Sequence, residues 1–143
     1  MSRFIDDGLK LKAKNISNYL VERFNNDFNK NNINNTFKLS VKDAYEGNGY
    51  VIYFENKKIY YDVQLLPKYE ENGKNRILLL GTYYFFLLPD KTTKNDYYYY
   101  FLHIIRSAFK QQKKNETVYG CCPHCLFEIN KKIDSFGQVN ILV

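Results

Sequence analysis

The chain has 143 residues, of which 45% are hydrophobic and 17% aromatic, and it carries a formal net charge of +6. This length and apolar content predict one globular domain spanning residues 1–143, and they exclude an intrinsically disordered chain. The positive charge would suit an anionic partner, and it would equally serve as a solubilising surface. Only four of the 21 cationic side chains are Arg, however, the residue that best clamps phosphates and reads bases.

Targeting and membrane signals are missing from the sequence pattern. The first residues, MSRFIDD, lack the apolar core of a secretory signal. All three cysteines fall at residues 121–125, which argues against a disulfide framework. The longest apolar run, residues 76–88, is shorter than the roughly 18 residues that a membrane helix needs. We therefore expect a cytoplasmic protein without a membrane partner.

The first predicted element is an amphipathic helix from about residue 4 to residue 28. An Asn-rich stretch, residues 25–35, then predicts a loop, because Asn side chains compete with the backbone for hydrogen bonds. The large apolar residues of the stripe recur at spacings of seven, four, four and four, and Ala13 fills the gap, as expected for a helix lying on a sheet. Its members are Leu9, Ala13, Ile16, Leu20, Phe24 and Phe28.

Four strands are predicted next, at residues 36–45, 50–54, 59–66 and 76–88. Short polar turns separate them, so neighbouring strands should be antiparallel and form a meander. The last run is the most continuously apolar part of the chain and has Gly81 inside it. It is interpreted as the central strand, buried on both faces or bent at Gly81.

A second helix is predicted after Thr93, where Thr93 and Asp96 resemble a capping box. Its apolar face should pack on the sheet. Residues 126–129 and 139–143 are predicted as short strands of a C-terminal hairpin. The expected fold class is therefore α+β: an N-terminal helix, a four-stranded antiparallel meander, a second helix packed on the sheet, and the short hairpin.

The densest chemistry is a stretch that holds all three cysteines and one of the two histidines. Cys122 and Cys125 have the spacing at which a tight turn places two thiolates on one Zn²⁺, which then needs two more ligands. The candidates are Cys121, His124 and the distant His103, and a dimer that shares one ion would also complete the set. In the alternative interpretation the cysteines are small buried hydrophobic residues without a metal.

The tetrapeptide Cys122-Pro123-His124-Cys125 resembles the active-site motif of periplasmic disulfide oxidases with the thioredoxin fold. The resemblance implies a thiol redox enzyme that uses Cys122 and Cys125, with a lowered thiol pKa. It covers these four residues alone. That family continues with much of its domain and a proline-bearing loop, whereas no Pro follows Cys125 here. We therefore do not expect a thioredoxin fold.

A second short pattern, Asp43 followed by Glu55-Asn56-Lys57, is similar to the Asp...Glu-x-Lys pattern of restriction-endonuclease-like nucleases. In that family the acids hold Mg²⁺ and the Glu-x-Lys lies along a strand. Here it falls in a predicted hairpin turn. We interpret it as a solvated turn.

The function expected from these patterns is that of a small intracellular, non-catalytic binding protein that contacts another protein, with homodimerisation also open. Interface-forming Tyr and Phe are abundant while catalytic groups are scarce. Its Asn- and Lys-rich composition would fit a phage, viral or mobile-element accessory factor. A thiol redox enzyme is one alternative. The other is a nucleic-acid-binding module with a structural zinc clip, whose contacts would be Lys110, Lys113, Lys114, Lys131 and Lys132.

Overall fold

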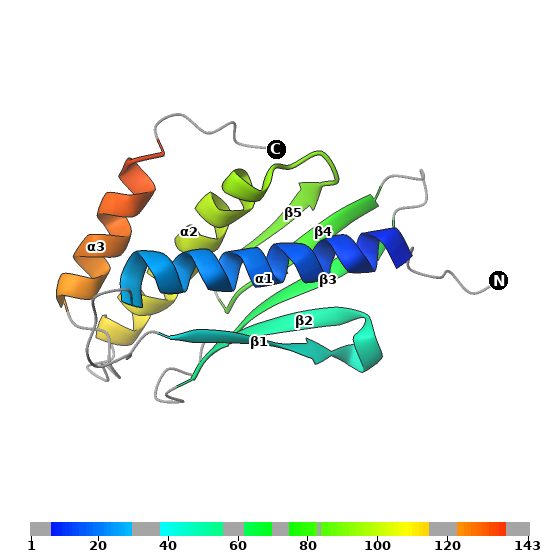
Figure 1. Ribbon diagram of the computed structural model, residues 1–143. Coiled ribbons are helices and arrows are strands. Elements are labelled where there is room, and N and C mark those ends of the chain that lie inside the picture. Colours follow the sequence, from blue (N-terminus) through cyan, green and yellow to red (C-terminus); the bar gives the residue numbers. More distant parts are fainter. Residues whose placement is uncertain are drawn as a thin grey trace.

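The computed structural model describes residues 7–29, 38–55, 62–69, 75–82, 84–114 and 123–136. In these ranges, helix α1 crosses the sheet, and α2 and α3 lie toward one side (Figure 1). None of the helices described is both long and apolar enough to cross a membrane. The elements are α1 (Asp7–Asn29), β1 (Leu39–Ala44), the short 3-10 turn η1 (Tyr45–Gly47), β2 (Gly49–Phe54), β3 (Val63–Tyr69), β4 (Asn75–Leu80), β5 (Phe85–Pro89), α2 (Lys94–Lys114) and α3 (Pro123–Asp134).

Helix α1 confirms the predicted amphipathic helix. Its stripe from Leu9 to Phe24 is at most 3% exposed, whereas Leu11, which lies off the stripe, is 58% exposed. The Phe24 ring packs edge-on against Phe54 of β2 and Phe101 of α2, with centroid distances of 6.3 and 6.1 Å. Helix α1 therefore contacts β1, β2 and β3 as well as α2.

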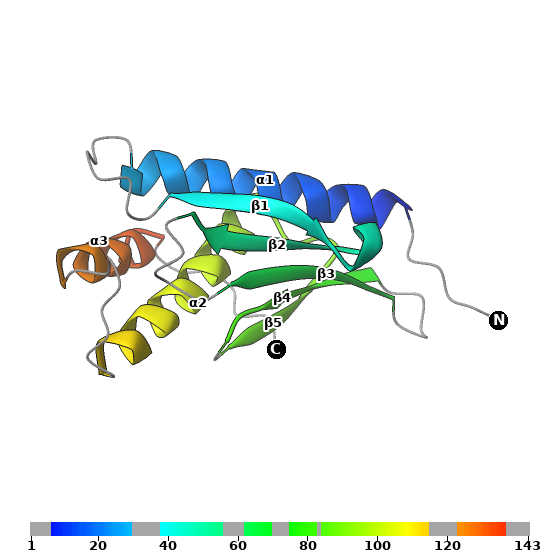
Figure 2. The same cartoon turned by 90° about the horizontal axis from the view of Figure 1, so that it is seen from below.

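The strands form one antiparallel sheet in the order β1-β2-β3-β4-β5, which confirms the α+β class and the antiparallel meander. Figure 2 shows the strands in this order below α1. Alternate residues of a strand share a face, so the register assigns each side chain to one of two faces. The inner face, which contacts α1 and α2, carries the buried residues Leu39, Ile52, Phe54, Val63, Leu65, Ile77, Leu79 and Leu88.

The apolar run at residues 76–88 forms two strands instead of the one predicted, so the sheet has five strands. The expected bend at Gly81 is a complete reversal: Leu80 pairs with Phe85, and the Gly81 N–H donates to the Tyr84 carbonyl oxygen at 2.9 Å. The turn was hidden in the sequence because apolar residues continue through it. Glycine is required there, since a Cβ on Gly81 would lie 2.2 Å from Cγ2 of Ile104.

Helix α2 confirms the predicted second helix and its N-terminal cap. The Thr93 hydroxyl oxygen accepts the backbone N–H of Asp96 at 3.1 Å. The Tyr100 ring packs at 4.8 Å on Phe86 of β5, so α2 lies on the inner face together with α1. Burial extends around most of the helix and includes Tyr97, Tyr98, Tyr100, Phe101, Leu102, Ile104, Ile105 and Ala108.

The prediction of a C-terminal hairpin is wrong for its first strand, because residues 126–129 belong to helix α3. Pro123 opens the helix, a position where its missing N–H and restricted φ are favourable. Ile129 and Ile133 are buried one helical turn apart, and α3 packs on α2. An apolar segment of four residues is too short to distinguish the period of a helix from that of a strand. The second predicted strand, residues 139–143, lies outside the described residues.

Candidate functional site

Three of the five predicted zinc ligands lie on two helices, with His103 on α2 and His124 and Cys125 on α3. Cys121 and Cys122 lie outside the described residues, while His124 and Cys125 stand in the first turn of α3 and have their backbone described. In the parts of the chain described here, no three His, Cys, Asp or Glu side chains could jointly hold a metal ion. Zinc binding therefore stays a prediction that depends on the cysteine segment.

His103 does not face the start of α3. Two contacts show which parts of α2 and α3 lie side by side. Arg106 Nη1 lies 3.4 Å from Asn130 Oδ1, and the Tyr99 ring lies 5.5 Å from the Phe136 ring. His103, between Tyr99 and Arg106, is thus level with the last turns of α3. It is far from the first turn, which carries Cys125.

The His103 ring is already engaged within α2. Its Nδ1 lies 2.7 Å from Arg106 Nη2, and because the guanidinium can only donate, Nδ1 is the acceptor. The Tyr99 ring packs edge-on at 4.5 Å. Burial, and then the positive charge of Arg106, lower the pKa of His103 below its usual value. The imidazole is therefore held neutral.

We expect His103 to make the free energy of unfolding depend on pH. In the unfolded chain the imidazole takes up a proton as the pH falls through about 6.5, while the folded state, with its lower pKa, stays neutral to lower pH. Stability from this group is thus complete above that pH and is lost below it. Urea unfolding from about pH 7.5 to about pH 5.5 should show a smaller decline for His103→Gln, which keeps an acceptor for Arg106 but does not titrate. An equal decline in both proteins would contradict the assignment.

The five predicted nucleic-acid contacts lie on two helices. Lys110 is exposed on α2, and Lys113 and Lys114 occupy its last turn. Lys131 is exposed on α3, whereas Lys132 is partly buried and its Nζ lies 3.4 Å from Asp27 Oδ2. At least Lys132 therefore has a structural contact between α3 and α1.

Asp27 is the centre of a polar cluster, formed by Arg23, Asp27, Tyr98 and Lys132, that joins the three helices. Its Oδ2 accepts the Tyr98 hydroxyl at 2.6 Å and lies 3.9 Å from Arg23 Nε. The Arg23 guanidinium stacks 4.2 Å from the centre of the Tyr98 ring. Burial and the hydrogen bond to Asp27 raise the pKa of Tyr98 far above its usual value. The Asp27 cluster therefore stabilises helix packing.

The acids of the nuclease-like pattern lie at opposite ends of the β1–β2 hairpin. Asp43 pairs with Tyr50 next to the turn, whereas the Glu55 N–H donates to the carbonyl oxygen of Lys38 at the other end. The Glu55 carboxylate also accepts the Ser40 hydroxyl. Asp43 and Glu55 are thus not brought together as a pair of metal ligands.

The largest feature that the sequence interpretation missed is the outer face of the sheet, opposite α1 and α2. Three rows of side chains cross β3, β4 and β5 on this face. One row is mixed: Lys42, Val51, Gln64, Leu80 and Phe85. The next is aliphatic, Leu66, Leu78 and Leu87, and the third is Lys68, Arg76 and Pro89. The signal in the sequence is the absence of polar alternation in residues 76–88, which also fits a strand that is buried on both faces or bent at Gly81.

An aromatic side chain extends this face at its β1–β2 end. Tyr45 and Glu46 adopt positive φ angles of 54° and 56° in the turn between the strands, a conformation that is unfavourable for residues other than Gly. The turn lays the Tyr45 ring over Gly49, and its hydroxyl donates to Gln64 Oε1 at 2.5 Å. Tyr45 remains 56% exposed. The outer face therefore combines aliphatic and aromatic surface.

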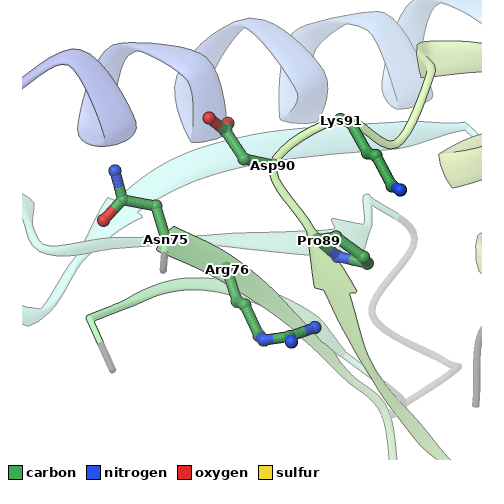
Figure 3. Close-up of a pocket in the computed structure, with 5 residues that line it drawn as sticks. All are labelled: Asn75, Arg76, Pro89, Asp90 and Lys91. Atoms are coloured by element: carbon green, nitrogen blue, oxygen red, sulfur yellow. The ribbon is translucent and has the colours of Figure 1, made fainter. Parts of the chain in front are cut away.

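The third row has a cationic character and borders a pocket. Lys68 and Arg76 are directly opposite each other on β3 and β4. The pocket has a volume of about 480 Å³ and is lined by Asn75, Arg76, Pro89, Asp90 and Lys91. Asp90 points toward α1 and Arg76 points away from it (Figure 3), and the Asp90 carboxylate forms an ion pair with Lys12 at 2.7 Å. The acid of the pocket is thus neutralised from α1.

Comparisons with known proteins add no assignment. No protein-family model matches the chain, and no similar protein was found among curated proteins or solved structures. Its function has to be inferred from its own residues, and the outer face is the feature of the described structure that most needs a functional explanation.

Proposed function

We propose that the protein is a small, non-catalytic binding protein that recognises another protein through the outer face of its sheet. The observation that carries this proposal is the continuous apolar surface of Leu66, Leu78 and Leu87, adjoined by Leu80 and Phe85. Phe85 is 64% exposed and Leu87 41% exposed. Leu66, Leu78 and Leu80 are partly exposed. Contiguous apolar surface that solvent can reach is typical of protein interaction sites.

The expected partner has an apolar contact surface with acidic groups at one edge. The aliphatic row would fit an apolar counterpart, and the adjacent Lys68 and Arg76 would favour carboxylates opposite them. Because cysteines without a disulfide framework suit a reducing compartment, we place the encounter in the cytoplasm.

Single-stranded nucleic acid is the second candidate partner for the same face. Bases stack on exposed aromatic rings beside cationic side chains. On this face, the Lys42 ammonium lies 5.3 Å from the centre of the Tyr53 ring. Tyr45 and Phe85 are exposed. The aliphatic centre favours protein, since Leu side chains offer a base no stacking surface. The zinc clip and the thiol redox enzyme remain predictions for residues 121–125.

The experiment compares two variants with the same chemical change on opposite sides of the molecule. Leu66→Lys places a charge in the aliphatic row of the central strand β3, where the long side chain can still extend to water. Leu11→Lys makes the same change at an exposed position of α1. Each tagged protein is used to capture partners from extract of the source cells, and captured proteins are purified and tested for direct binding.

We expect a directly binding protein that is retained by wild type and Leu11→Lys and is lost with Leu66→Lys. Equal binding by all three would contradict the proposal. Recovery of nucleic acid instead, with binding that persists at physiological salt, would favour the second candidate, because nonspecific charge attraction weakens steeply with salt.

A further inference from the structure

The outer edge of β5 offers backbone groups that no described residue bonds. Gly81 and Tyr84 form a hydrogen-bonded pair at the β4–β5 turn, and hydrogen-bonded and non-hydrogen-bonded pairs alternate along an antiparallel ladder. The pairs Leu80–Phe85 and Leu78–Leu87 are therefore non-hydrogen-bonded. Phe85 and Leu87 direct their N–H and C=O groups away from β4.

The end of the strand supports this assignment. By the same alternation, Pro89 falls at an outward-facing position opposite Arg76, where its missing N–H costs no ladder bond. Its carbonyl oxygen accepts the N–H of Thr92 at 3.0 Å instead. No described residue bonds the outward groups of Phe85 or Leu87, so the edge offers two donors and two acceptors.

The side chains at this edge are also uncovered. Phe85 and Leu87 are 64% and 41% exposed, and they are the same two residues whose backbone groups face outward. Residues 84–89 contain no charged side chain. Natural sheets ordinarily protect an exposed edge with charges, bulges or covering segments.

The opposite edge of the sheet shows such protection. Leu39 occupies one of the outward-facing positions of β1, because the adjacent residues Lys38 and Glu55 form a hydrogen-bonded pair. The Asn25 side-chain amide of α1 fills that position: its Nδ2 donates to the Leu39 carbonyl oxygen at 3.0 Å, and its Oδ1 accepts the Leu39 N–H at 2.9 Å. β1 also carries the exposed charges of Lys42 and Asp43. The contrast singles out β5.

We propose that β5 pairs with β5 of a second copy of this chain, so that the two sheets join into one continuous antiparallel sheet. Antiparallel pairing about a two-fold axis at Phe86 is the register that uses all outward groups. Phe85 then exchanges both hydrogen bonds with Leu87 of the partner subunit, and Leu87 does so with Phe85 of the partner subunit. This contact uses the backbone edge of β5, and it shares the Phe85 and Leu87 side chains with the outer face.

A second copy suits this edge better than an unrelated extended segment because the strand is complementary to itself. In this register the exposed Phe85 and Leu87 side chains cover each other on the outer face, as cross-strand apolar pairs do. The charges that follow β5 do not meet like charges, since Asp90 falls opposite Thr82 of the partner subunit. An apolar strand without charge therefore meets its own sequence without electrostatic cost.

The test measures mass in solution by sedimentation equilibrium, from dilute to concentrated protein, for wild type and Leu87→Pro. Proline removes the outward N–H of Leu87 without removing a bond to β4, and it is tolerated on an edge strand. We expect a concentration-dependent dimer for wild type and a monomer for Leu87→Pro. Leu87→Ala, which keeps the N–H but removes most of the side chain, should weaken the dimer at least tenfold without abolishing the pairing. A wild-type monomer throughout the concentration range would overturn the proposal.

Hydrogen exchange on the wild-type chain tests the register independently of whether the proline variant folds. The Phe86 and Leu88 amides, which bond β4, should be protected at every concentration. Protection of the Phe85 and Leu87 amides should appear only as the dimer forms. Fast exchange of both amides in a dimer would overturn the β5 interface, and so would protection in the monomer, which would mean that a segment of the same chain covers the edge. Leu66→Lys should leave the dimer intact, which separates this result from the outer-face experiment.

Discussion

Gly81→Ala is expected to destabilise the fold by about 2–3 kcal/mol, an effect typical of overpacking in a well-ordered core. The added methyl would lie 2.2 Å from Cγ2 of Ile104 and 3.3 Å from the Tyr84 carbonyl oxygen. Ile104 cannot move its methyl aside easily, because a β-branched side chain in a helix has one strongly preferred rotamer. Either α2 must move from the sheet or the β4–β5 turn must distort. Urea unfolding followed by circular dichroism measures the loss.

A double-mutant cycle with Ile104→Ala tests the stated cause. Ile104→Ala removes the methyl that Gly81→Ala would strike, at the separate cost of a cavity. Added to Ile104→Ala, the Gly81→Ala substitution should therefore cost clearly less than it does in wild type. The same cost in both backgrounds would show that the contact with Ile104 is not what requires glycine.

Asp27→Ala is expected to cost about 2 kcal/mol, because it removes the shared acceptor of the Asp27 cluster and leaves the buried Tyr98 hydroxyl without its partner. The Asp27 side chain is 22% exposed, so its ion pairs with Lys132 and Arg23 are partly screened. We assign most of the loss to the hydrogen bond. Because Lys132 belongs to α3, hydrogen exchange should also show α3 opening more readily than β4 in this variant.

Two control variants separate the hydrogen bond from the charge. Asp27→Asn keeps an acceptor for the Tyr98 hydroxyl and should retain most of the stability that Asp27→Ala loses. Tyr98→Phe, introduced into Asp27→Ala, removes the orphaned hydroxyl and should recover part of the loss. If Asp27→Asn were as unstable as Asp27→Ala, the charge of Asp27 rather than its hydrogen bond would dominate the cluster.

Some features of the fold could be predicted from local sequence patterns alone. The stripe of α1 from Leu9 to Phe24, the capped start of α2 and the antiparallel order of the strands were predicted from periodicity, capping and short turns. All are present. Such signals are readable because each residue's burial depends on its position in its own helix or strand.

Features that depend on contacts between distant segments were decided only by the tertiary structure. The turn at Gly81 depends on Ile104, twenty-three positions later. The apolar segment at residues 126–129 is compatible with either helix or strand. Its packing against α2 in the folded protein is what favours the helix. The exposure of the outer face also depends on the tertiary structure. An uninterrupted apolar run indicates two apolar faces but not whether both are covered, and that depends on where α1 and α2 pack.

For the predicted metal and nucleic-acid residues, too, the sequence suggested candidates and the structure showed their contacts. Residue type and spacing selected Cys122, Cys125 and the lysines, but the sequence could not show that Lys132 contacts Asp27 or that His103 is held by Arg106. The candidate binding surface was likewise decided by the fold. Leu66, Leu78 and Leu87 lie on three successive strands and become one surface only through the register of β3, β4 and β5. The sequence by itself determined which segments are apolar. The packing of two helices on one side of the sheet determined which of those residues remain available for binding.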